Sequence, residues 1–484
     1  MRKWLPLVAI CLGAFILLVD VTIVNVALPS MASDLHASFS SLQWVMDVYA
    51  LALAALLMVA GSLADLFGHR RLYVTGLTVF ALASLAAALA PNAGALVAAR
   101  AVQGVGGAAM FATSAALVSA TYQGRDRGTA FGVWGAVNGA AAAAGPIMGG
   151  LLTEGFGWQA IFLVNLPVAV AAVLLTLKAL PAGGRGAGRL DLPGSFAFTL
   201  GAASLTYALI RGGEHGWTNA GTVTAFAVAA AAAVAFVLVE ARSAHPMLDL
   251  ALLRRPAFSG LLGGALLYQA AAFSGLVYLS LWLQNVLGLS PIRGGLALMP
   301  MAGASFLVAA LAGRLMHRFA PRLPIGGGLV LIAAGGAVLW LSVGSGSHAG
   351  SLAAGLGTAG AGVGLTTPVL VSAAVDAVPP QRAGMAGGAV NTFRQLGMSL
   401  GVALFGALFS SRLRAVTTGG GSVRAGYAAA IDRISLAAAF AGLLGAVLVL
   451  CLVRPGARPV PADADDTAPA REPGKEPGKA PAAH

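Results

Sequence analysis

Two ionisable side chains lie inside long apolar stretches of the sequence and are the residues best placed to do chemistry. Asp20 lies within the stretch 17–29, and Arg100 lies near the start of the stretch 94–120. An ionisable group at membrane depth is costly, so it faces a partner, a cavity or water. A buried carboxyl group can take up and release a proton near neutral pH, which makes Asp20 a candidate proton carrier. A structural aspartate that hydrogen bonds permanently to a neighbouring helix fits the residues equally well, and Arg100 could snorkel to the interface.

A short polar segment, 61–71, separates two apolar stretches and contains glycines, one acid and two basic residues. Gly61 allows a tight approach of the backbone, and Asp65 can pair with an arginine or sit at a helix N-terminus, where the helix dipole favours an anion. Arg70 and Arg71 predict that the segment lies on the cytoplasmic side. The residues alone describe either a simple topological turn or a gate.

A glycine-rich stretch around Pro146 predicts an unusual membrane helix. Gly145 and Gly149 are four residues apart, as are Gly135 and Gly139, so each pair makes a smooth face for another helix. Pro146 has no N–H group to donate to the preceding turn, and we expect the helix to bend there. This combination fits a pivot between moving bundles, and on its chemistry alone it fits a static packing seam equally well.

Polar and aromatic residues in other apolar stretches are candidates for a substrate path. These are Asn25, Asp47, Asn138, Tyr268, Trp282, Gln284, Asn391 and Arg394. An acid such as Asp47 also suits a solvated helix start, and an aromatic stripe also suits a lipid-facing or core position. Arg394 could bind an anionic group or tie helices together.

The elements that must position these residues are membrane helices. Of the 484 residues, 58% are hydrophobic and only 10% are charged, and apolar runs of about 20 residues, enough to cross a bilayer, recur along the chain. We predict an all-α polytopic membrane protein. Its fourteen helices are expected near 5–29, 44–64, 72–90, 94–120, 128–152, 160–180, 192–211, 221–240, 257–287, 291–314, 323–343, 350–375, 383–410 and 429–453.

The basic residues predict the orientation of these helices. Most lie in alternate short loops, which is the pattern of cytoplasmic loops, so we expect both termini inside the cell. The exceptions are Arg412, Arg414 and Arg424, which would lie outside. The net charge of +12 is spread along these loops and does not form a patch for nucleic acid.

An internal repeat divides the chain. Residues 313–322 match 61–70 at Gly, Leu, Phe and Arg, with His317 in place of Asp65. Transporters are often built from two such halves, with the substrate site between them. We predict a six-helix bundle over 1–180, two linking transmembrane helices over 181–250, a second six-helix bundle over 251–453 and a disordered cytoplasmic tail over 454–484.

Several classes of function are disfavoured by the sequence. The phosphate-binding pattern G-x-x-x-x-G-K-[ST] does not occur, so ATP is not expected to power transport. Cys11 and Cys451 lie in apolar segments, and the seven histidines lack ligand spacing, so we expect no disulfide, metal site or other cofactor. No pattern of convergent catalytic residues indicates an enzyme.

Five sequence motifs resemble one family of transporters. The segment 61–71 resembles the G-x-L-a-D-r-x-G-r-r signature of the major facilitator superfamily. The stretch 17–29 resembles the L-D-x-T-v-v-N-v-A-L-P signature of its fourteen-helix drug:proton antiporters, the EmrB/QacA-type branch. Residues 100–104 resemble the superfamily's R-x-x-Q-G pattern, and 384–397 resemble the branch's helix 13 pattern. Residues 141–150 resemble the antiporter motif G-x-x-x-G-P-x-x-G-G, which occurs in exporters.

The resemblance implies a mechanism in which residues have distinct roles. It implies export of an apolar or amphipathic drug in exchange for protons, driven by the proton motive force through alternating access. Asp20 would carry the proton and Arg100 would tune or relay it, while Asp65, Arg70, Arg71 and the 145–149 region would gate the transporter. We expect a monomer in the cytoplasmic membrane. The alternatives are a dedicated exporter of one natural product and a non-transporting membrane sensor or scaffold.

Overall fold

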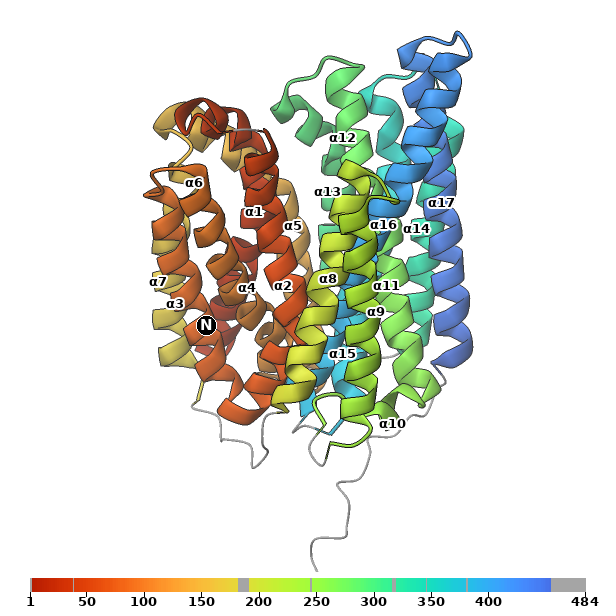
Figure 1. Cartoon of the computed structure of the whole chain (residues 1–484). Coiled ribbons are helices and arrows are strands. Elements are labelled where there is room, and N and C mark those ends of the chain that lie inside the picture. Colours follow the sequence, from red (N-terminus) through yellow and green to blue (C-terminus); the bar gives the residue numbers. More distant parts are fainter. Residues whose placement is uncertain are drawn as a thin grey trace, which may run out of the picture.

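The protein is a bundle of membrane-length helices, seen here in a computed structural model (Figure 1). The structure describes residues 2–37, 39–181, 191–243, 246–315, 319–344, 346–379 and 382–453. Every regular element within these ranges is a helix. Among the described residues, thirteen spans are long and apolar enough to cross a membrane. The helix Gly124–Phe156, 33 residues long, is the remaining member of the predicted set of fourteen.

The helices fall into two groups joined by a hairpin. The N-terminal group comprises η1 (Arg2–Trp4), α1 (Leu5–Asp34), α2 (Phe39–Phe67), α3 (His69–Ala88), α4 (Ala93–Thr121), α5 (Gly124–Phe156), α6 (Ala160–Leu163) and α7 (Asn165–Ala179). The linking hairpin comprises α8 (Leu192–His215) and α9 (Ala220–Glu240). The C-terminal group comprises α10 (Leu250–Leu253), α11 (Pro256–Phe273), α12 (Gly275–Asn285), α13 (Pro291–Leu315), α14 (Arg322–Ser342), η3 (Ala349–Leu352), α15 (Ala353–Asp376), α16 (Ala383–Thr418) and α17 (Val423–Leu452).

Local sequence signals explain where several of these helices begin. The side chain of Asn92 accepts a hydrogen bond from the amide of Ala95 at 2.9 Å and caps α4. Asp191 caps α8 in the same way, and Ser422 caps α17. Gly68, with φ of 96°, makes the turn from α2 into α3 that the segment 61–71 predicted.

Two predicted helices are interrupted, and one pair is longer than expected. The expected helix 160–180 is split at Val164, three residues before Pro167, which cannot donate to the carbonyl of Leu163. The expected helix 257–287 is split at Ser274. The last two helices extend to Thr418 and from Val423, so Arg412, Arg414 and Arg424 lie on helical extensions and not in a long loop. The composition of those extensions is polar, which is why hydropathy did not reveal them.

The two groups pack against each other through a few specific helices. Within the N-terminal group α4 packs on α2 and α3, and α1 packs on α5 and α7. Across the two groups, α5 packs on α13 and α15, and α16 packs on α2 and α4. The helices of the two groups diverge toward the upper end of Figure 1 and converge at the lower end, while α8 and α9 lie in front of both groups.

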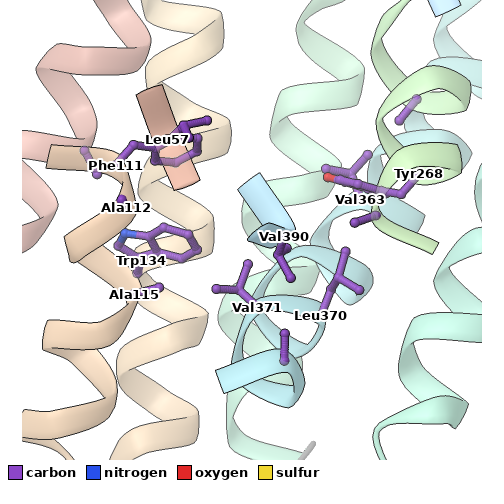
Figure 2. Packing of buried hydrophobic residues seen from close by; sticks show 14 of the residues in the cluster. Leu57, Phe111, Ala112, Ala115, Trp134, Tyr268, Val363, Leu370, Val371 and Val390 are labelled. Atoms are coloured by element: carbon purple, nitrogen blue, oxygen red, sulfur yellow. The ribbon is translucent and has the colours of Figure 1, made fainter. Parts of the chain in front are cut away.

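Apolar side chains fill the contact between the groups. Figure 2 shows Leu57, Phe111 and Trp134 of the N-terminal group facing Val371 and Val390 of the C-terminal group. All five belong to one continuous buried cluster. The hairpin is attached differently, because α8 packs on both α2 and α16 whereas α9 packs mainly on α8. The tail 454–484 and residues 316–318 of the internal repeat, including His317, lie outside the described residues.

Candidate functional site

A buried polar network in the N-terminal group joins the two ionisable residues that the sequence singled out. Asp20 on α1 and Arg100 on α4 have 0% and 1% of their surfaces exposed. Arg100 donates from its Nη1 to Oδ2 of Asp20 at 2.5 Å. The two ionisable residues that the sequence singled out are thus in direct contact, and their predicted roles in proton coupling stay a prediction.

Three further polar side chains complete the network. Gln103, one helical turn after Arg100, donates to Oδ1 of Asp20 at 2.8 Å and to the hydroxyl of Ser84 on α3 at 2.8 Å. Asn165, the first residue of α7, also donates to Oδ1 of Asp20 at 3.0 Å. Four helices therefore contribute to one site. Sequence reasoning did not identify Ser84 or Asn165 as site residues, although each is a polar residue in an apolar helix.

Aromatic rings and a backbone carbonyl surround the guanidinium group. Arg100 donates from its Nε to the carbonyl of Val45 at 3.1 Å. Its guanidinium carbon lies 4.2 Å from the ring centroid of Tyr49 and 5.8 Å from that of Phe162. Cation–π contacts of this kind strengthen when they are desolvated. Arg100 is therefore held from α2 and α6 as well as by Asp20.

The network neutralises a buried carboxylate and satisfies its hydrogen bonds. Three donors, one of them the positively charged Arg100, satisfy the Asp20 carboxylate, which is what a buried anion requires. Protonation of Asp20 would remove the charge that attracts Arg100 and would make one acceptor oxygen into a donor. The hydrogen bonds to Gln103 and Asn165 would then have to rearrange, and with them the packing of α1 against α4 and α7.

Asp65 closes the contact between α2 and α16 at one end of the molecule. Its Oδ1 and Oδ2 accept hydrogen bonds from the backbone amides of Gly384 and Met385 at 2.7 and 2.8 Å. These amides belong to the first turn of α16, where the helix dipole favours an anion. Asp65 thus occupies a helix N-terminus, one of the two arrangements that the sequence left open, and the helix belongs to the other group.

Glycines allow the backbones of α2 and α16 to touch beside Asp65. A Cβ atom on Gly61 would lie 2.4 Å from the carbonyl oxygen of Gly384, and one on Gly388 would lie 2.8 Å from that of Leu57. Neither backbone atom can move aside alone. Arg70 donates to the carbonyl of Leu177 on α7 at 2.8 Å, and Arg71 is exposed.

A second charged contact between the groups lies elsewhere at the same end. Arg127 near the start of α5 contacts Asp376 at the end of α15 at 2.5 Å. The side chain of Asp376 is 53% exposed and yet paired. The contact could not be read from the sequence because the partners are 249 positions apart in the chain.

The two glycine pairs of α5 face different partners. Gly145 lies against Thr22 and the carbonyl of Val19, and Gly149 lies against the carbonyl of Ile23, all on α1. Gly135 lies against Pro368 of α15, and Gly139 lies against Ser305 of α13. The helix α5 therefore packs closely on α1, which carries Asp20, and on the other group. The side chain of Pro146 lies outside the described residues.

Comparison with known proteins places this arrangement in a family. The sequence profile described as "Major Facilitator Superfamily" matches residues 10–402. The chain belongs to this superfamily.

Curated relatives of this superfamily member are resistance and export proteins. It is 37% identical over 413 residues to "Multidrug resistance protein Stp" of Mycobacterium tuberculosis (strain CDC 1551 / Oshkosh), covering 85% of this chain and 76% of that one. It is 37% identical over 424 residues to "Tetracenomycin C resistance and export protein" of Streptomyces glaucescens, covering 85% and 77%. It is 36% identical over 481 residues to "Puromycin resistance protein pur8" of Streptomyces alboniger, covering 97% and 95%.

A solved structure shares the fold. The human organic anion transporter MFSD10 (TETRAN) aligns with a TM-score of 0.66 at 16% identity, covering 93% of this chain and 99% of that one. At that identity the likeness shows the major facilitator fold, which was the fold predicted from the sequence.

The predicted substrate residues of this major facilitator protein are only partly brought together. Arg394 donates to Gln269 at 3.1 Å and to Asn391 at 3.3 Å, and its guanidinium lies 5.7 Å from the ring of Tyr268 and 5.8 Å from that of Phe111. Phe111 is on α4, so Arg394 reaches the facing group. Its bonds tie helices together, which is one of the two roles that the sequence left open.

The other candidates are dispersed. Trp282 is 1% exposed and lies in the core of the C-terminal group, whereas Gln284 is exposed and donates to Ser280. Asn138 on α5 is buried, and Asp47 on α2 is half-buried. The side chain of Asn25 lies outside the described residues.

One small apolar cavity lies inside the C-terminal group. It is lined by residues of α11, α12, α13, α14, α15 and α17, including Met301, Ile332 and Ile434. None of the predicted substrate residues lines it, so the aromatic residues Tyr268 and Trp282 do not form a shared pocket there.

Proposed function

We propose that the protein is a proton-coupled antiporter that exports apolar or amphipathic drugs across the cytoplasmic membrane. The observation that supports this most is the contact between Asp20 and Arg100, completed by Gln103 and Asn165. A buried carboxylate that is paired with an arginine and bonded to two neighbouring helices, α4 and α7, can couple its own protonation to helix movement. The relatives named for resistance and export support drugs as the substrate.

The proposed cycle links the proton site to the gate. In the present state Asp20 is paired, and the groups are joined through Asp65 and through Arg127 and Asp376. Protonation of Asp20 releases Arg100 and loosens α1 from its neighbours. The packing of α5 on α1 through Gly145 and Gly149 carries that change to α13 and α15 of the other group. The joined end then opens and the substrate enters from the cytoplasm.

The units that move are proposed to be those predicted from the sequence. They are 1–180 and 251–453, with 181–250 as the linking helices, and the end joined by Asp65 is taken as cytoplasmic. This orientation follows the positive-inside pattern of the loops, with both termini in the cytoplasm. The proton motive force supplies the energy, no cofactor is required, and the monomer is the working unit.

A narrower function is the second candidate. Two relatives are named for resistance to one compound, tetracenomycin C or puromycin. The protein would then export a single natural product and protect the cell that makes it. Competition among chemically unrelated substrates separates the two functions, because a dedicated exporter is inhibited by few of them. A sensor or scaffold without transport is the third reading, and it predicts damage mainly from deletion of 454–484.

The test is efflux of a fluorescent lipophilic drug from cells that express the wild type or Asp20→Asn, with and without a protonophore. We expect export by the wild type that the protonophore stops, and no export by Asp20→Asn at equal expression. Glu154→Gln on α5 is the matched control, because this acid is exposed. Normal efflux by Asp20→Asn would remove Asp20 from the mechanism.

A further inference from the structure

Two acidic side chains face each other at one end of the linking hairpin. Asp191 caps the N-terminus of α8, and Glu240 is the last residue of α9. Their oxygens Oδ2 and Oε1 each lie 2.8 Å from the point that a Cβ atom on Gly194 would occupy. The two carboxyl groups therefore share one small space that exists because residue 194 has no side chain.

Both facing oxygens are buried and have no partner. Asp191 and Glu240 are 8% and 4% exposed, and neither Oδ2 of Asp191 nor Oε1 of Glu240 has a hydrogen-bond partner in the described structure. Their other oxygens are occupied, because Oδ1 of Asp191 accepts from Gly194 at 2.8 Å and Oε2 of Glu240 accepts from Leu248 at 3.3 Å. Both free oxygens lie 2.8 Å from the same point, and two buried carboxyl groups that share a site favour a proton or a cation between them over two bare charges.

Within the described part of the chain, the charged groups that act on Glu240 do not supply that cation. The electrostatic neighbours of Glu240 are Asp191 and Asp249, and both are acidic. Arg382, just before α16, is paired with Asp249 at 2.8 Å. On α2, which also packs on α8, the acid at this end is Asp65, whose oxygens are taken by amides of α16.

Asp249 is itself ionised and adds negative charge beside the pair. Its partial burial alone would raise its pKa, but hydrogen bonds from Arg382 and the Ala251 amide, with the charges of Arg382 and Arg255, outweigh burial and lower the pKa below its usual value. A fixed negative charge next to two buried carboxyl groups favours neutralisation of one of them.

We propose that Asp191 and Glu240 bind one proton between them, as a carboxylic acid that donates to a carboxylate. A metal ion fits the site less well, because the described His, Cys, Asp and Glu residues form no group of three that could hold one. The shared proton joins the start of α8 to the end of α9. Glu240 also accepts a hydrogen bond from the amide of Leu248, which joins the hairpin to the segment that contains Asp249. Asp249 is in turn paired with Arg382, which lies just before the N-terminus of α16.

Infrared spectroscopy of the purified full-length protein in detergent tests this site without any transport. At neutral pH we expect the carbonyl band of a buried carboxylic acid in the wild type, and loss of that band in Glu240→Gln and in Asp191→Asn. Asparagine can still cap α8, so Asp191→Asn keeps the fold if Glu240→Gln does not. Glu154→Gln, at an exposed acid, retains the band. Retention of the full band in both hairpin variants overturns the proposal.

Thermal unfolding against pH gives a second readout. The folded state binds this proton more tightly than the unfolded chain does, so its contribution to stability is lost as the pH rises. We expect the melting temperature of the wild type to fall at alkaline pH, and that of Glu240→Gln to fall less over the same pH range. The same pH dependence of the melting temperature in both proteins overturns the proposal. A melting temperature that rises with added Na⁺, Mg²⁺ or Ca²⁺ in the wild type alone, with no carboxylic acid band, shows a metal site and also overturns it. Neither measurement depends on Asp20, so failure of the proposed export leaves this result intact.

Discussion

At the scale of single residues, Arg100 and Asp20 neutralise each other in a place where neither charge could remain alone. Asp20→Asn leaves a buried guanidinium with no counterion, and removal of one partner of a buried pair costs about 3–5 kcal/mol. Arg100→Gln leaves the buried carboxylate of Asp20 with no counterion. We expect the double variant, Asp20→Asn with Arg100→Gln, to be more stable than the sum of the single losses predicts, with a coupling of about 0.5–3 kcal/mol. Thermal unfolding of the four proteins in one detergent measures this coupling.

The same four proteins separate the structural role of the pair from its role in transport. Additive losses would show that the 2.5 Å contact contributes nothing specific to stability. All three variants are expected to lack proton-driven export, including the double variant whose fold is rescued. Restored export in the double variant would show that the pair serves only to hold the helices.

Residue identity allowed part of this site to be predicted. An acid and an arginine deep in apolar stretches are rare enough to be recognised in one sequence. Ser84 and Asn165 were not recognised, because serine and asparagine are common in membrane helices and only three-dimensional packing shows that both reach Gln103 or Asp20. The Asp191 and Glu240 pair was missed for a related reason. Each lies at a helix end, where an acid is unremarkable, and only the hairpin brings them together.

At the scale of elements, the approach of α2 to α16 depends on residues without side chains. Gly61→Ala places a Cβ atom 2.4 Å from the carbonyl oxygen of Gly384 in this state. Overpacking of this kind costs about 1–3 kcal/mol, which shifts the equilibrium away from the joined state by about five- to 150-fold. Gly303→Ala on α13 is the control, because its Cβ atom would meet open space. We expect no such shift for Gly303→Ala.

A single cysteine at position 385 reports that shift. Met385 is 3% exposed in the joined state, and its amide bond to Asp65 does not involve the side chain. With Cys11 and Cys451 replaced, Met385→Cys should react with a maleimide faster in the Gly61→Ala background than in the Gly303→Ala background. Equal labelling rates would mean that the glycines do not control this contact.

Helix positions were largely predictable because hydropathy reports the length of chain that must cross the bilayer. The predicted helix bounds are wrong where an effect other than hydropathy determines where a helix ends. Proline breaks the hydrogen-bond ladder after Leu163, and the polar extensions of α16 and α17 continue beyond the apolar span. Which helices of the two groups would touch could not be derived, because the glycine faces of α5 indicate close packing without indicating which helix is the partner.

At the scale of the whole molecule, the two groups are joined by contacts at one end, and the proposed alternating access requires these contacts to break in every transport cycle. Arg127 and Asp376 form the contact that is most accessible to reagents, with side chains 23% and 53% exposed. As an exposed ion pair it contributes at most about 1 kcal/mol, so the protein should tolerate replacement of both residues. A covalent bridge at the same place would hold the joined state permanently.

We therefore predict that a flexible bifunctional thiol reagent stops export by Arg127→Cys/Asp376→Cys in a background without Cys11 and Cys451. The matched control is Lys3→Cys/Asp126→Cys, since Lys3 and Asp126 form a 2.7 Å ion pair within the N-terminal group. Bridging that pair leaves the two groups free to separate, and export should continue. If the reagent contains a disulfide, its reduction should restore export in the first variant. Undiminished export with the 127–376 bridge in place would mean that substrate crosses the membrane without separation of these groups at this end, and the rocking mechanism would have to be abandoned.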